Sequence, residues 1–245
     1  MNTEQTITAL RKLRLHGMAD RYYEFTKLPA AKQLDAHTLI GMLAEAEADY
    51  KQKARFANLI KQANLRFIAF PEDIECSKER GLEAELWLVL CEGKYLKDAQ
   101  NILLTGPTGS GKSFTACALG YKAAMLGHKV QYVKLSKFTE IIRRAKIEGN
   151  YLKLADRLSK MELLILDDWG LDSLDREMCL SLYEILDERF NRVPTIITSQ
   201  YPVSHWYDFI KDVTLSEAIL DRLINNAVNI TLKGESRRKK NKSMK

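Results

Sequence analysis

The sequence contains no uninterrupted apolar stretch that approaches the ~20 residues needed to cross a bilayer. Its first residues, Met1-Asn2-Thr3-Glu4-Gln5, lack the order of basic residues followed by an apolar run that marks a secretion signal. These absences exclude a membrane-spanning helix and favour a protein that stays in the cytoplasm. We therefore expect a cytoplasmic protein with no membrane partner.

Cysteine and histidine are also scarce, with four of each in 245 residues. Cys76, Cys91, Cys117 and Cys179 are scattered without C-x-x-C spacing, and the histidines lie far from them and from one another. Zinc sites and disulfide frameworks both need closer or more regular spacing. We expect buried, reduced thiols rather than a metal site or disulfides.

Positive charge is modest overall, at +6, but it is concentrated in two segments. Residues 234–245 carry six basic residues against one acid, and residues 134–160 carry eight against three. Such concentration suggests a polyanion that is bound at defined places, which for nucleic acid would make binding salt-dependent. A solvated helix face and a frayed basic tail would give the same pattern. The candidate nucleic-acid contacts are Lys134, Lys137, Arg143, Arg144 and Lys146.

Residues 3–70 are patterned as helix throughout, with Pro29 as the only proline before Pro71. Apolar residues recur at helical spacing in three stripes, with a break near Gly17 between the first two. Three amphipathic helices without a nucleotide motif predict a small all-α domain over residues 1–75. Its basic and acidic residues are nearly balanced, so the domain could bind either DNA or a protein partner.

One motif organises the rest of the chain. Residues 106–113 fit the phosphate-binding pattern G-x-x-x-x-G-K-[ST], directly after the apolar run 102–104. Backbone N–H groups of such a loop converge on phosphate oxygens at the start of the next helix, the lysine reaches the β- and γ-phosphates, and the hydroxyl can sit on Mg²⁺. A glycine-rich turn that happens to carry a lysine is the alternative. We predict that the Ser113 hydroxyl binds Mg²⁺ and that the whole loop binds ATP, through Gly106, Pro107, Thr108, Gly109, Ser110, Gly111, Lys112 and Ser113.

After this loop the pattern alternates between helix and strand, as expected of a parallel sheet with helices on both faces. Helices are predicted at 112–126, 136–160 with an interruption near Gly149, 175–191 and 216–226, and strands at 129–134, 163–166, 195–198 and 228–232. The continuous apolar run 163–166 is typical of a strand buried on both faces. We predict an α/β nucleotide-binding domain over residues 76–233 and a basic tail over 234–245.

Two acids end the apolar strand at 163–166. A phosphate-loop ATPase needs an acid at this point, so Asp167 would hold Mg²⁺ opposite Ser113, and Asp168 would activate the attacking water. A strand-ending turn is the alternative for this pair.

Two further side chains are candidates for contact with the γ-phosphate. In the expected sheet order the strand at 195–198 lies between the loop strand and the acid-bearing strand, so Gln200 at its tip, with Ser199 behind it, would face the γ-phosphate; a plain turn is the alternative. Arg222 comes late in the chain and could act across a subunit boundary on a neighbour's nucleotide. An ion pair with Asp221 or Glu217 would also explain Arg222.

Together these motifs resemble a known family. The loop, Asp167-Asp168-Trp169-Gly170, Thr198-Ser199-Gln200 and Leu220-Asp221-Arg222-Leu223 are similar to the IstB/DnaC branch of the AAA+ ATPases. The stretch Leu13-Arg14-Leu15-His16-Gly17-Met18-Ala19 is more similar to IstB, the ATP-dependent helper of an insertion-sequence transposase, than to the helicase loader DnaC.

The resemblance implies a P-loop, RecA-like ATPase that assembles as a homo-oligomer on duplex DNA, with ATP at subunit interfaces, and presents the target to a transposase. It implies that Lys112, Ser113, Asp167 and Asp168 serve ATP and Mg²⁺, and that the basic 134–160 segment grips nucleic acid. It also implies that Gln200 is the first sensor, Arg222 the trans finger and Arg238 the second sensor.

Two departures from the family pattern have consequences. Asp168 stands where most AAA+ members carry Glu, so a shorter side chain would act through a further water and hydrolyse slowly. The sequence stops about a dozen residues after the last predicted strand, so we expect a truncated C-terminal lid. A helicase loader of the DnaC type and a monomeric small-molecule kinase remain alternatives: a loader should prefer single strands, and a kinase should not need Arg222.

Overall fold

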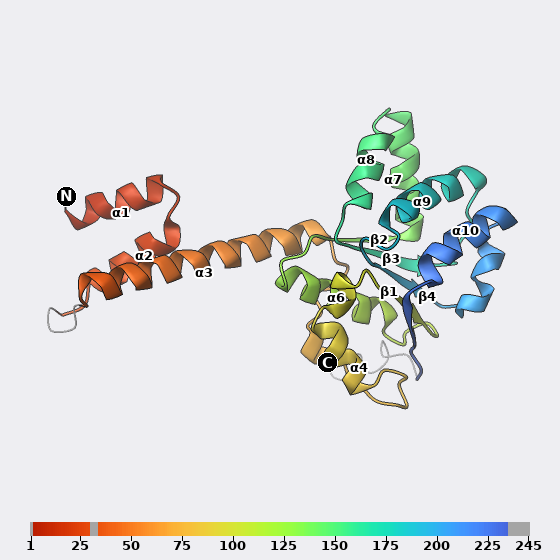
Figure 1. Cartoon of the computed structure of the whole chain (residues 1–245), viewed down its shortest axis with the longest axis horizontal. Helices are drawn as coiled ribbons and strands as arrows, with labels where there is room; N and C mark the ends of the chain where they lie inside the picture. The colour runs from red at the N-terminus through yellow and green to blue at the C-terminus, as the bar shows by residue number, and fades with distance from the viewer. Residues whose placement is uncertain (1, 30–33, 235–245) are drawn as a thin grey trace, which may run out of the picture. The chain divides into compact units, whose positions relative to one another are not determined.

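The computed structural model describes residues 2–29 and 34–234 (Figure 1). The chain divides into two compact units between Asn58 and Leu59. None of the helices in the described ranges is both long and apolar enough to cross a membrane.

The first unit is helical. It contains α1 (Thr3–Lys12), α2 (His16–Thr26) and most of α3 (Ala36–Ala63). The break expected near Gly17 is present, because the chain turns at Leu13 to Leu15, while Gly17 itself lies inside α2. A Cβ on Gly17 would lie 2.3 Å from the backbone oxygen of Ala46, so glycine is needed here for close packing of α2 on α3.

The second unit is built on a five-stranded parallel sheet in the order β2-β3-β4-β1-β5. Its strands are β1 (Asn101–Thr105), β2 (Val130–Lys134), β3 (Leu163–Trp169), β4 (Thr195–Ser199) and β5 (Ala227–Thr231). Burial on both faces explains the apolar runs, since Leu164, Ile165 and Leu166 are all fully buried. The position of β4 between β1 and β3 confirms the predicted sheet order.

Helices cover both faces of this sheet (Figure 1). On one face lies α6 (Lys112–Met125), with α4 (Ala84–Cys91) and the 3₁₀ turn η2 (Pro71–Asp73) packed against it. On the other lie α7 (Leu135–Ile147), α8 (Tyr151–Ser159), α9 (Arg176–Arg189) and α10 (Val213–Ile224), which share one apolar core. Two short elements, α5 (Lys94–Lys97) and η3 (Val203–Phe209), complete the described helices.

The division at residues 58 and 59 differs from the domain boundary predicted at residue 75. Residues 59–75 belong with the sheet unit because their side chains pack on α6: the Phe67 and Phe114 rings lie 6.0 Å apart, and the Phe70 and Tyr121 rings 5.1 Å apart. Ala69, which lies between Phe67 and Phe70 in the sequence, is fully buried. The segment after α3 is therefore part of the surface of the nucleotide-binding unit.

Candidate nucleotide-binding site

The phosphate loop connects β1 to α6, at the carboxyl edge of the sheet. Gly106 has φ +138°, and a Cβ there would lie 2.1 Å from the backbone oxygen of Leu232. Gly111 has φ +98° and directly precedes α6. Both positions require glycine, because L side chains rarely adopt these conformations and the space at Gly106 is filled by backbone. The backbone of the loop therefore has the geometry that the phosphate-binding motif predicts.

Polar groups in the loop are arranged for an anion. Lys112 is buried and its Nζ donates to the backbone oxygens of Gly106 (2.7 Å) and Pro107 (2.9 Å). The Ser110 hydroxyl is buried and has no hydrogen-bond partner among the described residues. A lysine held on carbonyl oxygens and an unpartnered hydroxyl, both beside the start of a helix, fit the phosphates of a nucleotide.

Asp167 lies opposite this loop and is completely buried. Its Oδ1 accepts hydrogen bonds from the hydroxyls of Ser113 (2.7 Å) and Thr198. Its Oδ2 accepts one from the Tyr132 hydroxyl and lies 3.6 Å from Nη1 of Arg66. Asp167 and Ser113 thus face each other as predicted, and their binding of Mg²⁺ stays a prediction. Desolvation and this carboxylate raise the pKa of Tyr132, so the phenol stays a donor at neutral pH.

Asp168 differs from Asp167 in its backbone and its exposure. Its φ of +64° is unusual for a residue other than glycine, and it falls where the register between β3 and β4 shifts. Its N–H donates to Thr198 Oγ1 (3.1 Å), which holds this conformation, and its Oδ2 lies 3.2 Å from Lys134 Nζ. Its side chain is about a quarter exposed, at 24 %. A partly exposed carboxylate next to a buried one suits two different roles.

Gln200 reaches the phosphate loop directly. Its Oε1 accepts a hydrogen bond of 2.6 Å from the Thr108 hydroxyl. Ser199 is buried and its hydroxyl donates to the backbone oxygen of Trp169 (2.9 Å), so this side chain ties β4 to β3. Of the two residues at the tip of β4, Gln200 is the one that contacts the nucleotide loop.

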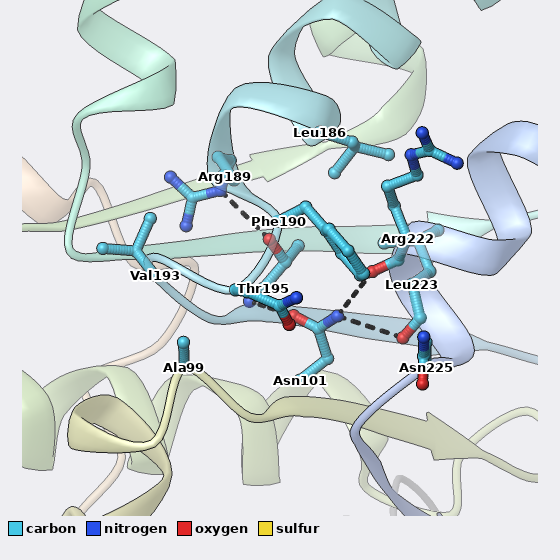
Figure 2. A pocket seen from close by; sticks show the side chains of 11 residues that line it. Ala99, Asn101, Leu186, Arg189, Phe190, Val193, Thr195, Arg222, Leu223 and Asn225 are labelled. Atoms are coloured by element: carbon cyan, nitrogen blue, oxygen red, sulfur yellow. Dashed lines mark hydrogen bonds between the residues drawn. The ribbon is translucent and has the colours of Figure 1, made fainter.

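Arg222 lies at the opposite edge of the sheet from the loop. Asn101 begins β1, and its side-chain amide donates to the backbone oxygens of Arg222 (2.9 Å) and Leu223 (3.1 Å), as Figure 2 shows. The phosphate loop starts after the last residue of the same strand, about 15 Å of strand away. Arg222 is therefore far from the loop of its own chain.

The Arg222 guanidinium has partners within the chain. Its Nε donates to Asp187 Oδ1 (3.0 Å), and a weaker pair links it to Asp221 (3.4 Å). The guanidinium also lies over the rings of Tyr183 and Phe190, at 5.2 and 5.7 Å. The alternative of an intramolecular ion pair is thus present in the single chain, although its main partner is Asp187, which the sequence did not indicate.

Figure 2 shows a small pocket that is lined by Arg222 and by a second arginine, Arg189. Arg189 is buried and donates to Thr195 Oγ1 (3.1 Å) and to the backbone oxygens of Leu158 (2.8 Å) and Met161 (2.7 Å). Burial lowers the pKa of this guanidinium to about 9. The hydrogen bonds of Arg189 hold the end of α8 to β4, which is a structural role. Of the two arginines in this pocket, only Arg222 has a partly exposed side chain.

The five predicted nucleic-acid contacts fall into two groups. Lys134 ends β2 and pairs with Asp168, so it lies beside the nucleotide site rather than on the outer face of α7. The other four lie on α7 and pair with carboxylates at 2.6 to 2.9 Å, namely Lys137 with Glu140, Arg143 with Asp175, Arg144 with Glu148 and Lys146 with Glu177. Their role in binding nucleic acid stays a prediction. Arg238 and most of the basic tail lie outside the described residues.

Sequence reasoning missed three contacts of Asp167. Thr198 and Tyr132 stand on neighbouring strands, and only the register of the sheet brings their hydroxyls to this carboxylate. Arg66 comes from a segment 101 positions earlier, and no local pattern pointed to it. The pair Arg66-Phe67, near the end of the predicted helical domain, was interpreted as core packing rather than as a platform for base stacking.

A parallel sheet with a glycine loop, a buried acid and a polar residue at the neighbouring strand tip defines a phosphate-loop nucleotide-binding protein. The profile of the family described as "IstB-like ATP binding protein" matches residues 8–245. The chain belongs to this family, and it is an AAA+ ATPase that binds ATP. The family resemblance of the motifs is thereby confirmed.

Individual proteins agree with this assignment. An insertion sequence ATP-binding protein of Sinorhizobium fredii is 38 % identical over 239 residues, which cover 98 % of both chains. AMPPCP-bound DnaA from Aquifex aeolicus superposes with a TM-score of 0.58 at 19 % identity, covering 74 % of this chain and 56 % of that one. The DnaC helicase loader superposes with a TM-score of 0.56 at 16 % identity, covering 67 % and 97 %. At such identities the two structures show a shared fold.

Proposed function

We propose that this ATPase serves an insertion sequence: it assembles as an oligomer on duplex DNA, with ATP at the subunit interfaces, and recruits or regulates the transposase of the same element. The observation that carries the proposal is the likeness, over 98 % of both chains, to a protein named as an insertion sequence ATP-binding protein. The position of Arg222, at the edge of the sheet away from its own loop, supports a site completed by a second subunit.

Mg²⁺ is the metal we propose for this site. The Ser113 hydroxyl and the Asp167 carboxylate, 2.7 Å apart, are the hard oxygen donors that Mg²⁺ prefers. The described residues contain no cluster of three or more metal-binding side chains, which agrees with an ion held mostly by phosphates and water. When bound, Mg²⁺ would neutralise charge on the phosphates.

The side chains of the site divide the remaining work. Lys112 would exchange the oxygens of Gly106 and Pro107 for phosphate oxygens at similar distances. Asp168 would orient the attacking water and accept its proton, for which the partial exposure of the carboxylate is suited. Gln200 would report the γ-phosphate through its contact with Thr108. Arg222 of a neighbouring subunit would stabilise the charge that develops in transfer.

The proposal is tested by the mass of the particle formed with ATP or a non-hydrolysable analogue, with and without random duplex of about five helical turns, or the equivalent single strand. We expect an ATP-dependent oligomer that forms on duplex DNA without any helicase. Preference for single strands together with a requirement for a helicase would instead support a loader. A monomer in every condition would contradict the proposed assembly.

A further inference from the structure

Residues 64–70 join α3 to the rest of the nucleotide-binding unit. This segment places a positive charge beside Asp167, the predicted Mg²⁺ ligand. Arg66 Nη1 lies 3.6 Å from Asp167 Oδ2, and Asp167 is completely buried. Asp167 is the only carboxylate that Arg66 pairs with in the described part of the chain. The other oxygen of the same carboxylate accepts the Ser113 hydroxyl, the predicted partner of Mg²⁺.

A cation at this position opposes a second cation on the same carboxylate. The two positive charges would lie within a few ångströms of each other on one buried carboxylate, where they repel each other even though the Arg66 side chain is about a third exposed. Mg²⁺ bound at Asp167 would therefore weaken the hold of the carboxylate on Arg66. Room for the guanidinium to leave exists, because Arg66 lines a hollow of about 550 Å³ that it shares with Lys134 and Arg157.

The residues on the C-terminal side of Arg66 determine the consequence of its release. Phe67 and Phe70 pack on Phe114 and Tyr121 of α6, yet the two phenylalanines are still 38 % and 44 % exposed. Besides these two half-exposed rings, the fully buried Ala69 and the ion pair of Arg66 hold the segment, and loss of the ion pair removes its charged contact with the site. The same segment continues directly into α3, which extends into the helical unit.

Resting on the proposed Mg²⁺ site, we propose that Arg66 is a positioning residue that competes with Mg²⁺ for Asp167, so that loading of Mg²⁺ and nucleotide frees residues 64–70 from α6. The coupling is reciprocal. If the ion pair of Arg66 lowers the affinity for Mg²⁺ by a given factor, bound Mg²⁺ lowers the equilibrium constant for attachment of the segment by the same factor. Occupancy of the nucleotide site is thereby transmitted to the chain that leads to the N-terminal helices.

Cys117 provides a reporter that does not depend on turnover. It stands on α6 between Phe114 and Tyr121, at spacings that place all three on one helix face, and it is fully buried. Burial raises the pKa of its thiol to about 11, and the backbone of Phe67 and Arg66 lowers the pKa in part, so the segment lies against the sulfur. Cys179 on α9 is the matched control, because it is also buried and its pKa is also raised to about 11.

The first measurement is the rate at which a thiol reagent labels each cysteine of the full chain, resolved by peptide mass spectrometry. A non-hydrolysable ATP analogue is present throughout, with Mg²⁺ or with chelator. We expect Mg²⁺ to raise labelling of Cys117 about tenfold, a typical coupling between two sites, and to leave Cys179 unchanged. Equal rates with and without Mg²⁺ would overturn the proposal.

The second measurement is the Mg²⁺ concentration at the midpoint of binding of a fluorescent ATP analogue. Arg66→Gln should lower this midpoint about tenfold, because the competing charge is gone. Arg66→Lys should stay near the parent value. Lys61→Gln is the control, since Lys61 is an exposed charge on the last turn of α3 without an ion pair in the described chain.

The sign of the change separates competition from simple support. If Arg66 only held Asp167 in place, Arg66→Gln would raise the Mg²⁺ concentration at the midpoint of binding. That result would overturn the proposed competition but not the proposed Mg²⁺ site. If the parent protein bound the analogue equally well with and without Mg²⁺, the proposed metal site would be wrong, and this inference would fall with it.

Discussion

Adjacent carboxylates with different surroundings are the main feature of the site at the scale of the residue. Asp167 is buried among hydroxyl donors, whereas Asp168 is partly exposed, has a positive φ and pairs only with Lys134 in the described part of the chain. The first is suited to hold a metal and the second to accept a proton from water. The two are neighbours in sequence, but a shift in strand register gives them different environments.

Asp168→Asn should bind ATP with nearly unchanged affinity and hydrolyse it at least about a hundredfold more slowly, because the amide cannot accept the proton. Asp172→Asn, four positions later and exposed, is the matched control and should keep normal turnover. Nucleotide binding and phosphate release measured on the same preparations separate the two steps. Normal hydrolysis by Asp168→Asn would remove this residue from catalysis.

Lys112→Ala should abolish nucleotide binding, since the ammonium group that now lies on the Gly106 and Pro107 oxygens would have no replacement. The measurement is titration with a fluorescent ATP analogue. Folding should be preserved, because Gly106 is only partly buried and Pro107 is exposed, so water can replace the ammonium group at their oxygens. Retained affinity would contradict the assignment of the loop as the phosphate site.

At the scale of the element, the basic side chains of α7 have two interpretations, contact with DNA and ion pairing within the chain. Its four predicted contacts with nucleic acid all pair with acids, but most of these pairs are exposed, and exposed pairs contribute only about 0–1 kcal/mol each. DNA phosphates can therefore replace the carboxylates at little cost. The helix stays folded without DNA because its apolar face, with Leu135, Phe138 and Ile142, is buried against the core.

Replacing Arg143, Arg144 and Lys146 with Ala should weaken duplex binding and reduce the slope of log affinity against log salt by roughly one per lost phosphate contact. A control with the same change in charge replaces Lys94, Lys97 and Lys211, which are exposed elsewhere on the unit. Affinity measured at several salt concentrations gives both slopes. Equal slopes for the two triple variants would return α7 to the role of a solvated face.

Sequence patterns predicted the helices and strands well where the feature depends on residues within one element. The buried run 163–166, the glycine loop and the interruption at Gly149 all correspond to observed features, and the position of β4 beside β1 confirmed the expected sheet order. What the sequence could not provide depends on packing between elements. The close approach of Gly17 to Ala46 and the ion pair of Arg66 with Asp167 both join segments that lie far apart in the sequence, so no local pattern indicates them.

At the scale of the whole molecule, Arg222 tests whether the active site is shared. Arg222→Ala should bind ATP but hydrolyse it poorly in the assembled state, whereas a mixture with Lys112→Ala should regain part of the turnover, because one variant supplies the loop and the other the arginine. Steady-state phosphate release from the mixture, compared with each variant alone, is the measurement. Normal hydrolysis by assembled Arg222→Ala would exclude a trans role.

The place of β1 in the sheet also has a consequence for synthesis on the ribosome. The strand that carries the phosphate loop pairs with β4 and β5, which are made some 90 and 120 residues later, whereas β2 and β3 are made in between. A nascent chain that has not reached residue 195 holds a complete loop motif on a strand with no partner. We expect such a chain to bind nucleotide weakly, so newly made protein should become competent for ATP only when its last strands have emerged.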